Sequence, residues 1–407
     1  MNPNFEPLTD SMPVDATQDS LEFSLVQGGL WFRFCRRTHL AGESFELVHR
    51  QALLFMLITW LPLLLLSALQ GYMFARTIKV PFLRDIAANA RFLVALPALI
   101  FAELGVHRRI SPLIRRFTQR RIIETGDMPK FAAAVKSAMR LRDLVFVEAA
   151  LLVSVYTIGL WVWRSEIALG DQTWYALPDR MHLNLTLAGY WYVFVSIPIF
   201  QFLLVRWYLR LVIWFRLLWQ ISKLPLHLSA AHPDRAGGIG FLGAGSFAFA
   251  PILFAQGALL SGWIADRVLI DGRPLMSFKL EAVGTAAFLI LVVLGPLVMF
   301  MPQLAAALRK SSAEYGVLAS RLVFCFEEKW VKEAKSQTNE LLSNEDLRSL
   351  SELSNVYTNV RQMRLVPFWT NDIVRLAVSV AAPLLPLALT ILSPMELLRF
   401  VIKMVFH

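Results

Sequence analysis

The stretch QALLFMLITWLPLLLLSALQGY, residues 51–72, contains no charged residue in 22 consecutive positions. The hydrocarbon core of a bilayer is about 30 Å thick, so a helix needs about 20 mostly apolar residues to cross it. This stretch therefore predicts a transmembrane helix. Six further stretches have a similar length and character, at residues 87–106, 144–163, 187–206, 241–265, 282–301 and 373–392. Together they predict an all-α integral membrane protein with about seven transmembrane helices.

The composition of the whole chain supports this class. Of its 407 residues, 56% are hydrophobic and 17% are charged, and the mean hydropathy of +0.53 is too high for an ordinary soluble protein. The stretch at 87–106 is the weakest of the seven, because its densely apolar part is short and contains Glu103; a re-entrant segment is the alternative. Residues 1–50 begin without the pattern of a cleaved signal peptide and are expected to form a cytoplasmic tail with an amphipathic segment.

Lysine and arginine residues predict the orientation. The segment 107–142 contains ten of them against Glu124 and Asp127 only, so the positive-inside rule places it in the cytoplasm. The N-terminus then lies inside, and the loops around Asp171 and Asp271 lie outside. The basic loop around Lys79 also falls outside, which is the one observation against this topology. Because the segment 107–142 would face anionic lipid headgroups, the net charge of +10 requires no nucleic-acid partner.

The chain divides around these spans. After the six-span region 51–305, residues 306–371 carry apolar residues at helical spacing in two stretches, which predicts a cytoplasmic helical hairpin before the last span. The two helices either only cover each other or offer a surface to a partner, including a second copy of the chain. Residues 372–407 are expected to hold the last span and an interfacial C-terminal helix.

Four charged residues fall at a similar depth inside the predicted spans: Glu103, Glu148, Arg206 and Arg210. A charged side chain at the centre of a bilayer costs about 2.5–3.5 kcal/mol on insertion scales, so such groups usually face the helix bundle and pair. We therefore expect ion pairs between these carboxylates and arginines. One possibility is that the pairs only hold the helices together near the headgroups. The other is that Glu103 or Glu148 belongs to a path for an ion or a proton.

The loop HPDRAGGIGFLGAGSF, residues 232–247, precedes the fifth predicted span. A helix N-terminus offers free N–H groups to an anion, so candidate ligand residues here are His232, Asp234, Arg235, Gly238 and Gly240. The alternatives are that the glycines allow close helix packing while Asp234 caps a turn, or that His232 takes part in a metal or catalytic site. A lone His-Pro-Asp does not provide enough ligands for a metal, and neither a metal nor a cofactor is expected.

Two segments carry a family resemblance: HPDRAGGIGFL, and RQMRLVPFWTNDIVRLAVSVAAPLLPLALTILSPMELL nearer the C-terminus. They resemble segments of a group of uncharacterised bacterial multi-pass membrane proteins. The resemblance covers these two stretches and implies a location in the bacterial inner membrane. It implies no activity, and no catalytic residue follows from it.

These observations favour a channel or transporter for a small ion or solute, in which the buried glutamates and arginines line a cytoplasm-facing vestibule. The alternative is a scaffold or signalling protein that recruits partners through residues 306–371. A membrane enzyme acting on a phosphate-bearing lipid would use Arg235 and the glycine N–H groups to hold phosphate. The enzyme is the least favoured class, because no nucleophile, metal cluster or paired-carboxylate motif accompanies the loop.

Overall fold

The structure is a computed structural model that describes residues 23–29, 33, 37, 47–74, 78–159, 161, 173–178, 183–328 and 344–388. The start of the predicted tail, residues 1–22, and the predicted interfacial C-terminal helix lie outside these residues. The described chain is almost entirely helical. Its one sheet is a short antiparallel hairpin of β1 (Ala176–Pro178) and β2 (Leu183–Leu185).

Six helices of the described chain are long and apolar enough to cross a membrane, rather than the seven that the sequence predicts. They cover Val48–Leu69, Ile86–Gln119, Leu187–Ile221, Phe241–Leu269, Leu275–Cys325 and Thr370–Ala388. The predicted span at 144–163 corresponds to a shorter apolar helix, Val145–Gly159. At 1.5 Å per residue these 15 described residues cover about 22 Å, and residues 160, 162 and 163 of the predicted span lie outside the described residues. The second predicted span belongs to a continuous helix, without the turn that a re-entrant segment requires.

Several of these helices are built from shorter elements. The first is the single helix α3 (Val48–Leu69). The others join α4 (Ile86–Ala90) to α5 (Leu96–Gln119), α9 (Leu187–Trp191) to α10 (Ile197–Ile221), α11 (Phe241–Ser246) to α12 (Ala250–Leu269), α13 (Lys279–Leu294) to α14 (Met301–Phe326), and α16 (Thr370–Ala381) to α17 (Leu385–Ala388). The remaining helices are α6 (Met128–Arg142), α7 (Val145–Ser154) and α15 (Asn344–Arg361).

Prolines lie at the joints between these elements. Pro97 and Pro198 each follow a π-helical turn, formed by Arg91–Ala95 and Tyr192–Ser196. Pro296 lies in a 3-10 turn, Gly295–Phe300. Proline has no N–H to donate to the carbonyl one turn earlier and its ring clashes with that carbonyl, which favours an irregular turn at these positions, whereas Pro62 and Pro112 lie inside α3 and α5.

Small residues bring the helices close together in the centre of the bundle. α12 contacts both α4 and α16. A Cβ atom at Gly257 would lie 2.2 Å from the carbonyl oxygen of Val380, and one at Gly262 would lie 2.9 Å from the Cα atom of Ala87. Small residues at such crossings let membrane helices gain van der Waals contact at short range.

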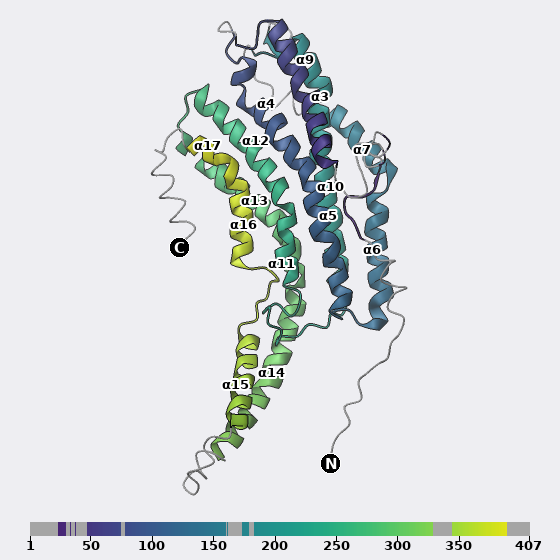
Figure 1. Cartoon of the computed structure of the whole chain (residues 1–407), viewed down its shortest axis with the longest axis vertical. Helices are drawn as coiled ribbons and strands as arrows, with labels where there is room; N and C mark the ends of the chain where they lie inside the picture. The colour runs from purple at the N-terminus through teal and green to yellow at the C-terminus, as the bar shows by residue number, and fades with distance from the viewer. Residues whose placement is uncertain are drawn as a thin grey trace.

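Two helices extend beyond the bundle (Figure 1). α14 continues from the helix of the sixth predicted span, and α15 lies beside it. Both project from the end of the bundle where α5 ends and α6 lies, which we call the basic end because it carries residues 107–142 (Figure 1). The first arm of the predicted hairpin is thus the extension of a span and not a separate helix.

Candidate functional site

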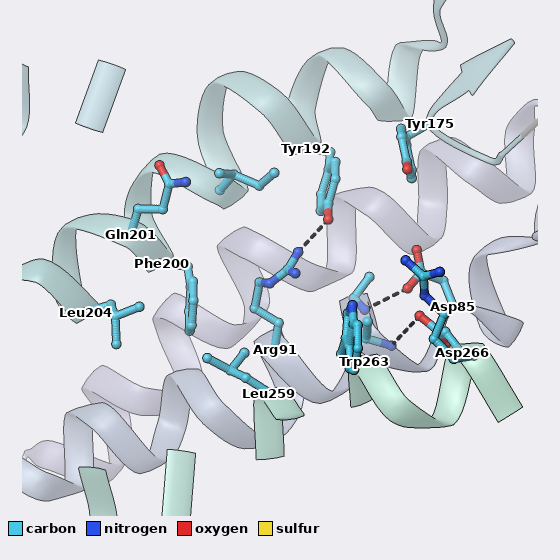
Figure 2. A pocket seen from close by; sticks show the side chains of 14 residues that line it. Asp85, Arg91, Tyr175, Tyr192, Phe200, Gln201, Leu204, Leu259, Trp263 and Asp266 are labelled. Carbon is cyan, nitrogen blue, oxygen red and sulfur yellow. Dashed lines mark hydrogen bonds between the residues drawn. The ribbon is translucent and has the colours of Figure 1, made fainter. Parts of the chain in front are cut away.

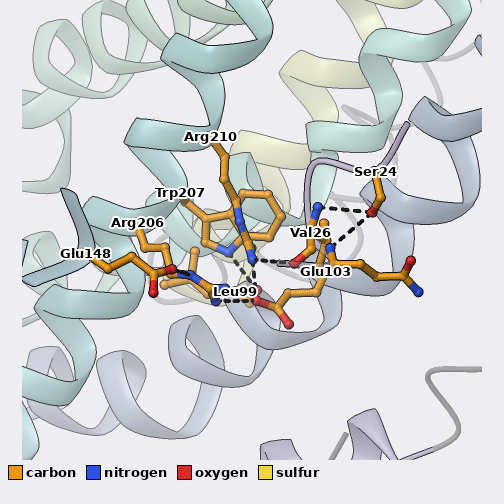
Figure 3. A network of polar contacts seen from close by, with 9 residues as sticks. Ser24, Val26, Leu99, Glu103, Glu148, Arg206, Trp207 and Arg210 are labelled. Atoms are coloured by element: carbon orange, nitrogen blue, oxygen red, sulfur yellow. Dashed lines mark hydrogen bonds and ion pairs between the residues drawn. The ribbon is translucent and has the colours of Figure 1, made fainter. Parts of the chain in front are cut away.

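The structure brings the four predicted intramembrane charges together in one network, which we call the charge cluster (Figure 3). Glu103 on α5 accepts hydrogen bonds from Nη1 of Arg206 and from Nη1 of Arg210, both on α10 and both over 2.9 Å. Nε of Arg206 also lies 3.4 Å from a carboxylate oxygen of Glu148 on α7. All four side chains are buried, and their formal charges cancel.

Polar contacts around the charge cluster hold the arginines in place. The second guanidinium nitrogen of Arg210 donates to the carbonyl of Val26 over 3.4 Å, and its Cζ atom lies 4.6 Å from the centre of the Trp207 ring. The indole N–H of Trp207 donates to the carbonyl of Leu99 over 2.8 Å. These contacts tie α5 and α10 together at this depth.

An irregular segment, residues 23–29, packs against the charge cluster (Figure 3). Phe23, Leu25 and Val26 are buried, although the sequence assigns them to the N-terminal tail. Gly29 has a φ of +82°, and a Cβ atom there would lie 2.3 Å from a carboxylate oxygen of Glu148. Glycine is therefore required on both conformational and steric grounds. The segment closes the bundle over the cluster.

Backbone N–H groups of the loop 232–247 donate to a side chain of the loop itself, the Asp234 carboxylate. The Asp234 carboxylate accepts hydrogen bonds from the N–H groups of Ala236, Gly238 and Gly240 over 2.9–3.1 Å. Nδ1 of His232 lies 2.9 Å from the same carboxylate. The N–H groups expected to hold an anion are therefore engaged by Asp234. Burial would raise the pKa of Asp234, but the three N–H donors and His232 together lower it below its ordinary value.

The glycines of this loop lie where other parts of the chain approach closely. A Cβ atom at Gly243 would lie 2.4 Å from the carbonyl oxygen of Pro367, and one at Gly245 would lie 2.3 Å from a methyl group of Leu113. The loop is also fastened by Arg364, which donates to the carbonyls of Asp234 and Arg235. Residues 232–247 therefore form a closely packed turn, which we call the packing corner. It contacts residues 364–368, so the two segments quoted in the sequence analysis lie against each other.

A cavity that the sequence did not predict, which we call the Arg91 cavity, lies beside α4 (Figure 2), at the end of the bundle opposite the basic end (Figure 1). Its volume is about 300 Å³. α4, α10, α12 and the π-helical turns line it. Its polar residues include Asp85, Arg91, Tyr192 and Asp266. One signal was present in the sequence, because Arg91 falls inside the predicted span 87–106.

Two carboxylates at this cavity hold the start of α4. Asp85 accepts hydrogen bonds from the N–H of Ala88 over 2.7 Å and from the indole N–H of Trp174 over 2.9 Å. Asp266, which belongs to α12, accepts from the N–H groups of Ile86 and Ala87 over 2.9 and 3.2 Å. Both carboxylates therefore satisfy donors that a helix N-terminus leaves free.

Arg91 and Tyr192 point toward each other from two helices that line the cavity (Figure 2). Each is the first residue of a π-helical turn, and Nη1 of Arg91 donates to the Tyr192 hydroxyl over 2.5 Å. π-Helical turns inside α-helices occur frequently at functional sites, because the wider turn re-aims the side chains around it. Two such turns at one cavity make it a candidate binding site.

The fold and these buried polar sites define an all-α, membrane-embedded protein with six helices able to span a bilayer. Comparison of the chain with protein-family models, with characterised proteins and with solved structures finds no match. The resemblance to a bacterial membrane-protein group stays a prediction from the sequence.

Proposed function

We propose that the protein transports a small solute across the bacterial inner membrane, with its N-terminus and the basic end in the cytoplasm. In this proposal Val145–Gly159 is the described part of a seventh span, and α14 and α15 form a cytoplasmic hairpin. The charge cluster is the gate on the cytoplasmic side, and the Arg91 cavity is the solute site toward the outer face.

One observation carries this proposal: the cavity and the charge cluster lie at two depths along the same pair of helices. Arg91 and Glu103 are 12 residues apart on one continuous helix, which corresponds to about 18 Å. The helix that carries Tyr192 also carries Arg206. In alternating access a solute site opens to one face of the membrane at a time, and here the charge cluster would close the cytoplasmic side while the cavity opens toward the outer face.

An apolar layer separates the two sites. It is formed by buried side chains of α5, α10 and the π-helical turn before α5, namely Phe92, Ala95, Leu96, Leu99, Phe200 and Leu203. Water and charged solutes pass such a layer only when the helices move apart. The π-helical turns at Arg91 and Tyr192 border this layer and are suited to act as hinges.

Labelling of the apolar layer tests the proposal without knowledge of the solute. In a chain without its two native cysteines, Ala95→Cys should react with a membrane-impermeant maleimide from the cytoplasmic face when the gate opens. Adding Glu103→Gln should weaken the gate and increase the labelling several-fold, whereas Glu314→Gln, an exposed acid on α14, should not. Equal labelling of Ala95→Cys in the Glu103→Gln and Glu314→Gln backgrounds would reject the gate.

A second candidate function is a scaffold that associates through residues 306–371. The observation that favours it is a set of exposed apolar side chains on α14, Val317, Leu318 and Val323. In this case a second copy of the chain is the partner to test first. Light scattering of the purified protein should then show an oligomer that Val317→Glu and Val323→Glu together convert to a monomer. An unchanged mass would argue against self-association through α14.

A further inference from the structure

We infer that the Arg91 cavity binds the anionic group of a small amphipathic molecule, a carboxylate, sulfonate or phosphate carried on an apolar body. The inference names the solute class of the proposed transporter and rests on that function for its biological role. Binding itself is a property of the cavity and can be measured without transport.

The carboxylates at the cavity are already engaged. Each oxygen of Asp85 and of Asp266 accepts a hydrogen bond from a backbone N–H group or from the Trp174 indole. Arg267, at the rim, lies 3.7 Å from the carboxylate of Asp271 and stacks on Trp263 at 5.4 Å. The acids therefore serve the local fold, and the rim arginine has its own acidic partner.

Arg91 differs from these residues. A guanidinium has five N–H donors, but the only hydrogen bond of the Arg91 side chain among the described residues goes to the Tyr192 hydroxyl. No described carboxylate lies within 4 Å of its nitrogens. Arg91 is half-buried, and Asp85 and Asp266 act on it electrostatically without accepting its hydrogen bonds, so most of its donors are available to an anion from outside the chain. The planar fork of N–H groups suits a carboxylate, sulfonate or phosphate in particular.

The walls of the cavity specify the rest of the ligand. Tyr192, Phe200, Leu204, Leu259 and Trp263 line it and offer aromatic rings and aliphatic side chains. A volume of about 300 Å³ is at the lower end of the range for small-molecule sites. The ligand is therefore a compact anion with an apolar body. A strongly hydrated inorganic ion would not cover the apolar side chains that line the cavity.

Calorimetry on the purified full chain in neutral detergent tests the inference. The probe is benzenesulfonate, and benzenesulfonamide is its uncharged counterpart of similar shape. Benzenesulfonate should bind at least about tenfold more tightly than benzenesulfonamide, since hydrogen bonds to charged groups contribute about 1.5–3 kcal/mol. Arg91→Gln should abolish this preference, and Arg273→Gln, which removes an exposed arginine elsewhere, should keep it. Equal affinities for the two probes in the wild type would overturn the inference.

A second variant, Arg91→Lys, distinguishes loss of anion binding from loss of the folded structure. Arg91→Lys keeps the charge but loses the fork, so it should retain a weaker preference for benzenesulfonate. Arg91 makes no hydrogen bond to Asp85 or Asp266, and each of these carboxylates keeps its own N–H donors, so Arg91→Gln should elute as a folded monodisperse protein. If Arg91→Lys and Arg91→Gln are both folded and both bind benzenesulfonate as tightly as the wild type, Arg91 does not recognise the anion.

The anion could come from solution or from a lipid headgroup, and nanodiscs distinguish these sources. Benzenesulfonate binding should be the same in phosphatidylcholine and phosphatidylglycerol discs if the natural ligand is soluble. Competition by phosphatidylglycerol that disappears in Arg91→Gln supports the same site with a lipid phosphate as its ligand. Arg91-dependent binding without any labelling of Ala95→Cys would confirm the site and reject the transporter.

Discussion

Glu103 and Arg206 lie 103 positions apart in the chain, and their side chains are joined by a hydrogen-bonded ion pair of 2.9 Å between buried atoms. Arg210 donates to the same oxygen of Glu103. One carboxylate thus accepts from two guanidinium groups on one helix, so its removal would leave two buried cations with only Glu148 nearby.

The first prediction follows from this shared carboxylate. Glu103→Ala should lower the free energy of unfolding by about 3–5 kcal/mol, because breaking a buried pair leaves an uncompensated charge. Adding Arg210→Met should restore part of the loss. The measurement is the thermal midpoint in detergent, with Glu314→Gln as a surface control. Additive losses in the double variant would contradict the pairing.

The second prediction concerns the packing corner at Gly243. Gly243→Ala should destabilise the protein by about 1–3 kcal/mol, since its methyl group would meet the Pro367 carbonyl and the Phe368 backbone. Gly284→Ala is the matched control on α13, where a Cβ atom meets nothing within 4 Å. It should leave the thermal midpoint unchanged or raise it. Equal effects of the two substitutions would show that the corner is not tightly packed.

The third prediction is a dependence on pH at Asp234. Its pKa is lower in the folded protein than the ordinary value of about 3.9, so its stabilising contribution is present above that pH and is lost as the pH falls through the folded pKa. Asp234→Asn should therefore lower the thermal midpoint at neutral pH, and the gap to the wild type should close under acidic conditions. A gap that stays constant from neutral to strongly acidic pH would show that the charge of Asp234 is unimportant.

The fourth prediction concerns topology. In a chain with Cys35 and Cys325 replaced by serine, Arg116→Cys and Gly272→Cys should label from opposite faces of the membrane. Both positions are exposed, and they lie at the two ends of the bundle. Labelling of both from one face would reject the orientation that the arginine-rich segment predicts.

The sequence alone predicted where most of the spans lie. Six predicted spans coincide with long apolar helices, because an uninterrupted apolar run has no stable alternative to a helix in a bilayer. The predicted span at 144–163 is represented in the described residues by the shorter apolar helix Val145–Gly159.

Only the tertiary structure decided which polar groups meet. The sequence predicted ion pairs between the carboxylates and arginines of the spans, but that one oxygen of Glu103 accepts from both Arg206 and Arg210 depends on how α5 and α10 cross. The sequence did not predict a site at Arg91. Its hydrogen-bond partner Tyr192 lies about 100 positions away, and the nearby carboxylates accept hydrogen bonds from other groups. Hydropathy is a property of each residue in turn and can be read along the chain, whereas partnership between buried charges depends on distances that exist only after the helices have packed.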